Sequence, residues 1–545
     1  MVRSLCRIGE TVHLVCQENH PEHYDFIARS VVHTRDGGET ETLSRDTPYP
    51  GRCILHKPEL DGTLPVFVWD KYEEHARVVP MVDLGTPEVE SYIECNVAVV
   101  RRVVAEHGIH VIHANHAVLM PTVAQRVSAS TGTPFTVMPH GSDIEYAVKK
   151  DERFRRYALA ALGEAKRVFV IGDEMRSRVL QVFSEAAGIE AKLTDLHLGV
   201  DTSEFEPVAR AGRAKNVEAL LSSLAGLPKG KSAGQENAML RALPKVRDVE
   251  GLRAVLGAAA KYDGKRPDHT ADAKLRSVPW TTAPTLLFVG RLIAWKGIQS
   301  LIAALPAAMQ QAPGLRTIVV GHGPLREAME ALVWALRSGR RDIVEMIVTH
   351  GGLLEKRGDA AHTESGLADV AAYYERLAGE DRLAEYFETA RRVLTGDSVI
   401  FTGYLTHTEL RHLFPCCDVG VFPSVVREAG PLVFLEALAS GCFPLGTYFG
   451  GMAASIDAVA EVVAPEVAEI MKLDPVNTVA DLARQIPRAL EHGPRHAPAL
   501  AELARDRYDW SSVSRDFMRE IEAIRSELHD QPHIGVDRGF GGATR

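Results

Sequence analysis

The sequence predicts an α/β protein in which two Rossmann-like, doubly wound domains face a central cleft and carry helical insertions. Its 545 residues are too many for one hydrophobic core, so at least two domains are expected. Short apolar runs alternate with helical patterns in two separate sets, which favours parallel sheets covered by helices. Sheets of this kind place ligand-binding groups at the carboxyl ends of their strands.

The first set of elements occupies the amino-terminal part of the chain. A helix is expected over residues 2–8 and a strand over 11–16. Further strands are expected over 53–56, 110–113, 135–138, 168–171 and 193–198. Together they define an expected first domain over residues 1–205.

The second set begins after a long polar stretch. Its strands are expected over 285–289, 317–320, 399–401, 419–422, 443–445 and 460–463, in a domain that covers residues 283–500. A helical insertion is expected over 331–395, where the 3.6-residue spacing is clearest in 371–394.

Three other segments lie outside these two domains. Residues 206–282 are rich in Lys, Arg, Gly and Ala, and we expect an inserted linker or cap with helical pieces over 237–243 and 252–260. Residues 501–530 are expected to form a helix that returns to the first domain. The tail, 531–545, is rich in Gly and charge and is expected to be disordered.

The most informative stretch is REAGPLVFLEALASG, residues 427–441, which places two carboxylates eight positions apart around a helix start. Gly430 and Pro431 mark that start, so Glu428 is expected in the preceding loop and Glu436 inside the helix. The free amides at the same helix end favour an anion. This combination of hydroxyl-binding carboxylates and an anion site suits a nucleotide sugar.

The spacing of Glu428 and Glu436 resembles the E-x7-E motif of retaining family 4 glycosyltransferases, which have the GT-B fold. Other landmarks of that family follow in order: PHGSD (139–143), LGVDT (198–202), FVGRL (288–292) with WKG (295–297), VGHGPL (320–325) and FTGYL (401–405). Leu198 stands where the family commonly has Asn. The ordered set spans most of the chain, although each glycine motif alone is weak.

The resemblance implies a cationic site for the leaving diphosphate. Arg291 and Lys296 should lie just beyond a strand end, where both can stabilise the charge that grows on the β-phosphate. The sequence has no Asp-x-Asp triplet of the kind that anchors a metal-bound diphosphate. We therefore expect no metal site for the reaction and no cofactor beyond the donor substrate.

The two carboxylates take different roles by the same resemblance. Glu428 would bind hydroxyls of the donor sugar, and Glu436 the ribose hydroxyls. From the residues alone, Glu428 is equally well a loop carboxylate stabilised by the helix dipole, and Glu436 a residue on a solvated helix face. Other expected donor-binding positions are Gly290, Gly321, Gly403, Tyr404, Ala429, Gly430, Pro431 and Leu432. Simple turn chemistry is an equal explanation for Gly323.

On the amino-terminal side, His140 is expected to contact the transferred sugar, since it follows a strand end and precedes Gly141. A packed or capping histidine is the alternative. Asn115 and His116 are expected in a loop that lines the acceptor cleft, with His113 less well placed. Asp143 is expected to be a helix cap rather than a base.

The predicted function is that of a retaining, metal-independent glycosyltransferase of the hexosyltransferase type. Its partners would be a nucleoside-diphosphate sugar and a glycan, lipid or small-molecule acceptor. A sugar phosphorylase, a nucleotide-sugar epimerase and an inactive nucleotide-sugar-binding pseudoenzyme are the alternatives. Donor, acceptor and oligomeric state are not predicted.

Composition limits the possible partners and the location of the protein. The net charge of −10 argues against a general nucleic-acid binder. Seven cysteines without C-x-x-C spacing indicate free thiols in a reducing compartment. No apolar run is long enough for a membrane helix and no signal sequence is visible, so a cytoplasmic location is expected, with peripheral contact to the inner face of a membrane left open.

The start of the chain departs from the family pattern. An initial strand and a Gly-rich loop usually precede the helix and strand found here at residues 2–16, and both are missing. Either the true start lies upstream of Met1 or the sheet lacks its first strand. We favour the first alternative, because a parallel sheet without a central strand leaves backbone groups unpaired.

Overall fold

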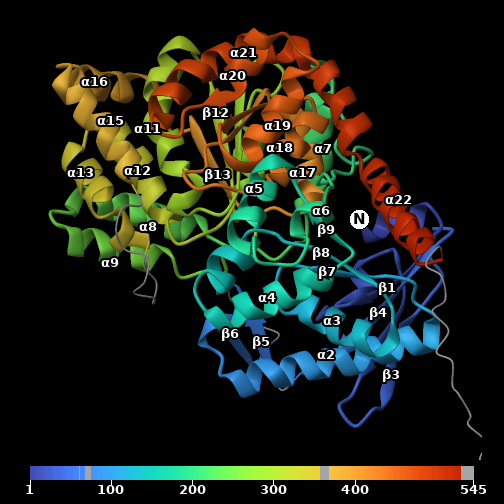
Figure 1. Cartoon of the computed structure of the whole chain (residues 1–545). Coiled ribbons are helices and arrows are strands. Elements are labelled where there is room, and N and C mark those ends of the chain that lie inside the picture. Colours follow the sequence, from blue (N-terminus) through green and yellow to red (C-terminus); the bar gives the residue numbers. More distant parts are fainter. Residues whose placement is uncertain (61, 68–74, 356–366, 429, 530–545) are drawn as a thin grey trace, which may run out of the picture. The chain divides into compact units, whose positions relative to one another are not determined.

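The computed structural model describes residues 1–60, 62–67, 75–355, 367–428 and 430–529. The chain divides into two compact units, one formed by Met1–His197 with Ser511–Arg545 and the other by Leu198–Trp510 (Figure 1). The segment 206–282 therefore lies within the second unit. Helix α22 (Trp510–His529) brings the end of the described chain into the first unit.

The first unit is an α/β unit with ten strands among its described residues. Its strands are β1 (Thr11–Val15), β2 (Ile27–His33), β3 (Glu39–Ser44), β4 (Arg52–Pro58), β5 (Thr63–Val66), β6 (Arg77–Pro80), β7 (Ile112–Asn115), β8 (Phe135–Met138), β9 (Arg167–Val170) and β10 (Leu193–Asp195). Its helices besides α22 are α1 (Val2–Arg7), α2 (Thr86–His107), α3 (Met120–Thr131), α4 (Glu152–Glu164), α5 (Gly172–Phe183) and α6 (Ile189–Lys192).

These strands form two four-stranded sheets and one strand pair. The order is β1-β4-β2-β3 in one sheet, β10-β9-β8-β7 in the other, and β5-β6 in the pair. The β2-β3 pair is antiparallel and was not expected, whereas the other pairs are parallel. Within the described residues β1 pairs only with β4 and β7 only with β8, so each lies at a sheet edge.

The second unit contains one larger sheet and many helices. Its strands are β11 (Thr285–Val289), β12 (Arg316–Val320), β13 (Val399–Gly403), β14 (Val419–Phe422), β15 (Phe443–Thr447) and β16 (Lys472–Leu473). Its helices are α7 (Arg213–Leu224), α8 (Ala233–Ala242), α9 (Val249–Ala259), α10 (Ala271–Arg276), α11 (Ile298–Gln311), α12 (Arg326–Ser338), α13 (Arg341–Thr349), α14 (Gly351–Glu355), α15 (Ala368–Gly379), α16 (Leu383–Val393), α17 (His407–Leu413), α18 (Leu432–Ala439), α19 (Gly450–Ala460), α20 (Pro465–Met471) and α21 (Thr478–Leu503).

The sheet of the second unit is parallel and runs in the order β13-β12-β11-β14-β15-β16. Counted along this unit, the order is that of the doubly wound Rossmann fold. The order reverses between β11 and β14, and ligands of such sheets bind beyond the carboxyl ends of the strands at this switch point. The loops after β11 and β14 are therefore the first place to look for a site.

Two sequence-based predictions need correction here. Residues 460–463 are not a strand, because Ala460 ends α19 and Val462 is 49% exposed in the turn that follows. The sixth strand is β16, a two-residue strand too short to give a periodic signal. The helix expected over 371–394 is two helices, α15 and α16, separated by Asp381 in the left-handed region at φ 58°.

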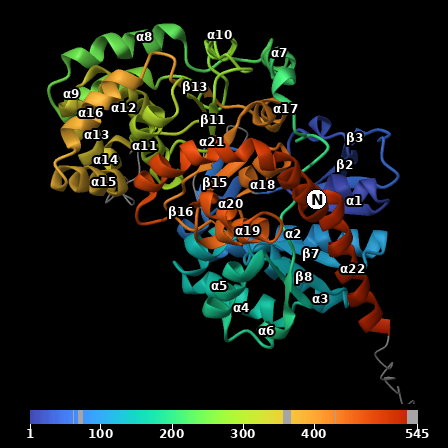
Figure 2. The ribbon, with the colours of Figure 1, turned by 90° about the horizontal axis from the view of Figure 1, so that it is seen from above.

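The helical insertion of the second unit packs as a group. Tyr373 of α15 and Tyr386 of α16 lie with ring centroids 6.0 Å apart, and Tyr386 donates a hydrogen bond to the carbonyl of Ala303 in α11. Helices α13, α15 and α16 gather at one end of this unit in both views (Figure 1, Figure 2). The expected tail, 531–545, lies outside the described residues.

The segment 206–282 packs tightly against the rest of the second unit despite its polar composition. Arg326 of α12 is 1% exposed and donates to Asp268 Oδ1 at 2.9 Å and to Glu330 Oε1 at 3.0 Å. Lys231 pairs with the same Glu330. Breaking a buried pair of this kind typically costs about 3–5 kcal/mol, so these charges fix the segment in place.

All seven cysteines are free, as expected, and Cys416 and Cys417 are buried. No helix in the described part of the chain combines the length and the apolar character that a membrane crossing needs.

Candidate functional site

The loops after β11 and β14 are joined by backbone contacts at the switch point. Lys296 ends a short 3-10 turn, Ala294–Lys296, and Gly297 follows at φ +73°. A Cβ on Gly297 would lie 1.9 Å from the carbonyl oxygen of Pro423, so only glycine fits here. Nearby, the amide of Val425 donates to the carbonyl of Trp295 at 2.9 Å. The loop that carries Lys296 is thereby fixed against the loop that leads to Glu428.

Lys296 and Glu428 meet at this junction. Lys296 Nζ donates to Glu428 Oε2 at 2.5 Å, although 132 positions separate the two residues. Ser424 Oγ donates to the other carboxylate oxygen, Oε1. The side chains of Lys296 and Glu428 are 33% and 22% exposed, so both remain accessible to a ligand. The structure thus brings together two of the residues that the sequence motifs single out.

Arg291 lies on the same loop, next to Gly290 and just beyond β11. Its side chain is exposed, and it makes no ion pair with any residue that the structure describes. Arg291 is therefore exposed to a ligand at this edge of the sheet.

Glu436 is buried, and the alternative of a solvated helix face is wrong. The residue is 4% exposed, and its Oε1 lies 3.0 Å from His407 Nδ1 at the start of α17. This hydrogen bond raises the pKa of His407. Within the described part of the chain, the buried Oε2 has no hydrogen-bond partner. Leaving such an oxygen unpaired costs about 1–3 kcal/mol, so Oε2 is an acceptor for a donor from water or from a ligand.

Helix α18 begins close to its predicted start. Pro431 caps the helix, Leu432 is its first residue and is 42% exposed, and Gly430 lies just before it. The first amides of a helix have no acceptor within the helix, so this end favours an anion. Ala429, another expected binding position, lies outside the described residues.

Two glycines after β15 hold the backbone of Glu428. The amide of Gly451 donates to the carbonyl of Glu428 at 2.8 Å. Gly450 has φ +58°, and a Cβ on it would lie 2.9 Å from the same carbonyl oxygen. These glycines therefore position Glu428 at the start of α19.

Three glycines at the carboxyl ends of β11, β12 and β13 lie side by side. The amide of Gly290 donates to the carbonyl of Val320, and the amide of Gly321 to the carbonyl of Gly403 at 2.9 Å. A Cβ on Gly321 would approach the carbonyl oxygen of Gly290 to 1.8 Å. Next to them, Tyr404 is 36% exposed, and its ring meets that of His322 at 5.4 Å. These positions line the same strand-end edge as Lys296.

In the first unit, His140 follows β8 and contacts Asn115, which is the last residue of β7 and not a loop residue as predicted. His140 Nε2 lies 2.9 Å from Asn115 Oδ1, and the His140 ring meets the ring of His116 at 4.8 Å. Burial lowers the pKa of His140, and it lowers that of His116 to about 4. The two rings are therefore neutral near pH 7 and can donate or accept a hydrogen bond.

Asp143 is a cap, as predicted from sequence. It is fully buried and accepts hydrogen bonds from the amides of Ile144 at 2.9 Å and Ala117 at 2.5 Å. His113 does not line this loop, because its ring packs against Phe169 and Phe517. His407 was missed, and its only sequence signal is its place two residues after the FTGYL motif.

Two family models match the chain. One, described as Glycosyltransferase Family 4, matches residues 58–204, and the other, described as Glycosyl transferases group 1, matches residues 369–492. The second match includes Glu428, Glu436 and His407 but starts after Lys296.

Curated relatives are distant. A 2-deoxystreptamine glucosyltransferase of Streptomyces kanamyceticus is 26% identical over 54% of this chain and 60% of its own length. A GDP-mannose-dependent alpha-(1-6)-phosphatidylinositol monomannoside mannosyltransferase of Mycobacterium tuberculosis is 22% identical over 51% of this chain and 54% of its own. The match thus spans only a little over half the length of these relatives.

Solved structures of similar proteins cover more of the chain at lower identity. Sucrose-phosphate synthase from Thermosynechococcus elongatus aligns over 95% of this chain and 100% of its own, with a TM-score of 0.49 and 15% identity. Anabaena HepE in complex with UDP and glucose aligns over 94% and 99%, with a TM-score of 0.48 and 14% identity. The chain thus carries a Glycosyltransferase Family 4 domain at residues 58–204 ahead of a Glycosyl transferases group 1 domain at residues 369–492.

Proposed function

We propose that this protein is a retaining glycosyltransferase that moves a sugar from a nucleoside-diphosphate sugar to an acceptor without a metal ion. The observation that carries the proposal is the Lys296–Glu428 contact at the switch point, together with the buried, unpaired oxygen of Glu436 one helix away. To bind a nucleotide sugar, a site needs a cation, an anion-binding helix end and a carboxylate with an unpaired oxygen.

In the proposed reaction, Lys296 and Arg291 stabilise the negative charge that develops on the departing β-phosphate. Arg can bind two phosphate oxygens through its planar fork, and Lys supplies a compact charge. The amides at the start of α18 add further donors. Preorganised charges of this kind lower the barrier most where charge appears in the transition state.

Glu428 and Glu436 would bind the two ends of the donor. Glu436 Oε2 is a buried acceptor without a partner in the described residues, so it suits a ribose hydroxyl. Glu428 would accept from hydroxyls of the transferred sugar. Its contact with Lys296 holds both side chains in place before the donor arrives.

His140 would serve the sugar and acceptor side of the reaction. The Asn115 contact orients its ring, and burial keeps the ring neutral at pH 7. A neutral histidine next to Gly141 can hydrogen-bond a sugar hydroxyl. Retention follows the family pattern, in which the acceptor attacks from the leaving-group side and the β-phosphate takes the proton.

By their printed names the relatives include a glucosyltransferase and a GDP-mannose-dependent mannosyltransferase, so they support a sugar nucleotide as donor without agreeing on which one.

The free thiols suit a reducing compartment, and we therefore propose that the protein acts in the cytoplasm.

A panel of UDP-, GDP- and ADP-sugars tests the proposal. We expect one donor to raise the melting temperature, because a ligand that binds only the folded state stabilises it. With a matching acceptor, the free nucleoside diphosphate should accumulate and the product should keep the anomeric configuration of the donor by NMR. Turnover that requires inorganic phosphate would instead indicate a phosphorylase, and an epimerised nucleotide sugar an epimerase. Stabilisation without turnover, with any acceptor tried, would indicate a pseudoenzyme.

A further inference from the structure

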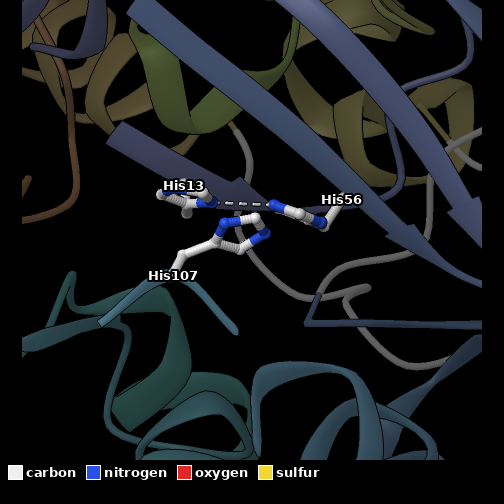
Figure 3. A group of neighbouring side chains, drawn as sticks. All are labelled: His13, His56 and His107. Carbon is white, nitrogen blue, oxygen red and sulfur yellow. Dashed lines mark hydrogen bonds between the residues drawn. The ribbon is translucent and has the colours of Figure 1, made fainter. Parts of the chain in front are cut away.

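Three histidines cluster in the first unit, outside the site described above (Figure 3). His13 lies on β1, His56 on β4, and His107 is the last residue of α2. Each offers a ring nitrogen, and these atoms all lie within 4.8 Å of one another. None of the three belongs to the motifs of the proposed reaction.

The geometry suits shared coordination. His13 Nδ1 and His56 Nε2 are 2.9 Å apart, and the ring of His107 stacks on that of His13 with centroids at 4.4 Å. Zinc binds imidazole nitrogen at about 2.0–2.1 Å in a tetrahedral arrangement, which places two ligand nitrogens about 3.3 Å apart. An increase of the His13 Nδ1–His56 Nε2 distance from 2.9 Å to about 3.3 Å would therefore allow both nitrogens to bind the ion.

A second layer of side chains orients His56. Its other ring nitrogen, Nδ1, lies 2.9 Å from His33 Nε2, and His33 Nδ1 lies 3.1 Å from Glu39 Oε1. When His56 donates its Nδ1–H to His33 Nε2, the lone pair of its Nε2 is left facing His13. Histidines that bind metals are commonly fixed through their second nitrogen in this way.

Burial keeps two of the three rings, His13 and His56, neutral. His56 is 3% exposed, and burial lowers its pKa to about 3 and that of His13 to about 4. Both rings are therefore neutral at pH 7, and protons do not compete with a cation there. His107 is exposed, which gives an ion a path from solvent.

We propose that His13, His56 and His107 bind a Zn²⁺ ion through three imidazole nitrogens, with water in the remaining position. The ion would link the edge of the β1-β4 pair to the carboxyl end of α2. This site is separate from sugar transfer and acts as a brace for the first unit.

Zinc binding by the full-length, tag-free chain tests the proposal, with a chromophoric chelator as competitor. We expect one tight equivalent in the wild-type protein, and at least about 100-fold weaker binding in His107→Ala. His110→Ala is the matched control, since it removes an exposed histidine three residues away and should bind as the wild type does. His107 is exposed, so its replacement should leave the fold intact by circular dichroism.

Two further measurements separate the outcomes. Zn²⁺ should raise the melting temperature of the wild type and of His110→Ala but not of His107→Ala, and Co²⁺ should give a tetrahedral absorption spectrum that is lost in His13→Gln. The exposed group His20, Glu22 and His23 is the competing site. Loss of the tight equivalent in a His20→Ala, His23→Ala double variant would overturn the proposal. So would the absence of tight binding, or unchanged binding in His107→Ala.

Discussion

Lys296 has two alternative counter-charges, the carboxylate of Glu428 that it contacts and the diphosphate that we propose as its ligand. The contact of 2.5 Å is short, but both side chains are partly exposed, and exposed pairs typically contribute about 0–1 kcal/mol. A doubly charged diphosphate can therefore displace Glu428 from Lys296 at little cost. The freed carboxylate would then be available for sugar hydroxyls.

Replacing Lys296 by Ala should lower the rate of sugar transfer by about 100- to 1,000-fold, because a preorganised charge on the leaving group is lost. The melting temperature should change little, since the pair is partly exposed. Initial rates at saturating donor give the measurement.

Lys215→Ala is the control for that experiment, because Lys215 is an exposed lysine on α7 of the same unit. It should transfer sugar at the wild-type rate. If Lys296→Ala also does so, the leaving-group role is wrong.

His113 makes the first unit sensitive to acid. Burial lowers its pKa from 6.5 to about 4, so the unfolded chain takes up a proton below pH 6.5 while the folded ring stays neutral. The stability that depends on neutral His113 is thus complete above pH 6.5 and is lost as the pH falls toward 4. The expected loss at pH 5 is about 2 kcal/mol.

Exchange of His113 for Asn should reduce the drop in melting temperature between pH 7 and pH 5, since the variant has no group to titrate at that position. Asn can keep the contact that His113 Nδ1 makes with Thr136 Oγ1 at 2.9 Å. His110→Asn, at an exposed position, should retain the wild-type drop. An equal drop in His113→Asn would show that another group causes the acid sensitivity.

Sequence reasoning singled out candidate site residues but not their environment. The E-x7-E spacing identified Glu428 and Glu436, yet left Glu436 open to a solvated helix face. Its burial depends on α17, because His407 covers one oxygen from a distant part of the chain. A helical pattern records which residues share a face and does not record what covers that face.

At the scale of elements, continuous apolar runs predicted the central strands well. Strands β8, β11 and β14 begin and end at the predicted residues, because a strand buried on both faces is mostly apolar. The β2-β3 hairpin was missed, since β3 is almost entirely exposed and polar. The false strand at 460–463 is the apolar end of α19 and its turn, which a short window cannot distinguish from a strand.

Gly297 tests whether the contact between the β11 and β14 loops matters. Gly297→Ala should lower the free energy of unfolding by at least about 2 kcal/mol, because the new Cβ would lie 1.9 Å from Pro423 and φ is +73°. Transfer should fall as well, since Lys296 precedes this residue.

Gly257→Ala is the matched control, because a Cβ there meets nothing within 4 Å and the residue lies inside helix α9. Alanine should stabilise that helix by about 0.5–1 kcal/mol. A Gly297→Ala protein as stable and active as the wild type would remove the structural basis for the position of Lys296.

At the scale of the whole molecule, the two sets of strands predicted two α/β units, and each is present. The packing of 206–282 could not be predicted, because its charges suggested a solvated linker. Asp418, next to β14, is 4% exposed and accepts from Arg213 Nη2 at 2.8 Å. A sequence does not distinguish charged residues that are buried in ion pairs from charged residues that face water.

Chelation tests the expected independence from metal ions. Transfer should persist after treatment with a strong chelator, because Lys296 and Arg291 supply the charge that a divalent ion would otherwise provide. The His107→Ala variant belongs in the same assay, since it lacks the proposed zinc site and shows whether any chelator effect arises there. Activity of both proteins that returns only with added Mg²⁺ or Mn²⁺ would contradict the expectation.

The central claim is that the corner formed by Lys296, Glu428 and Glu436 binds a nucleoside diphosphate. We test it by calorimetric titration of UDP, GDP and ADP into the wild type, Glu436→Gln and Glu491→Gln. Glu491 is an exposed glutamate on α21 and serves as the control. We predict that one diphosphate binds the wild type and Glu491→Gln alike, and binds Glu436→Gln at least about 10-fold more weakly. Equal affinity in Glu436→Gln, or no binding of any diphosphate to the wild type, would contradict it.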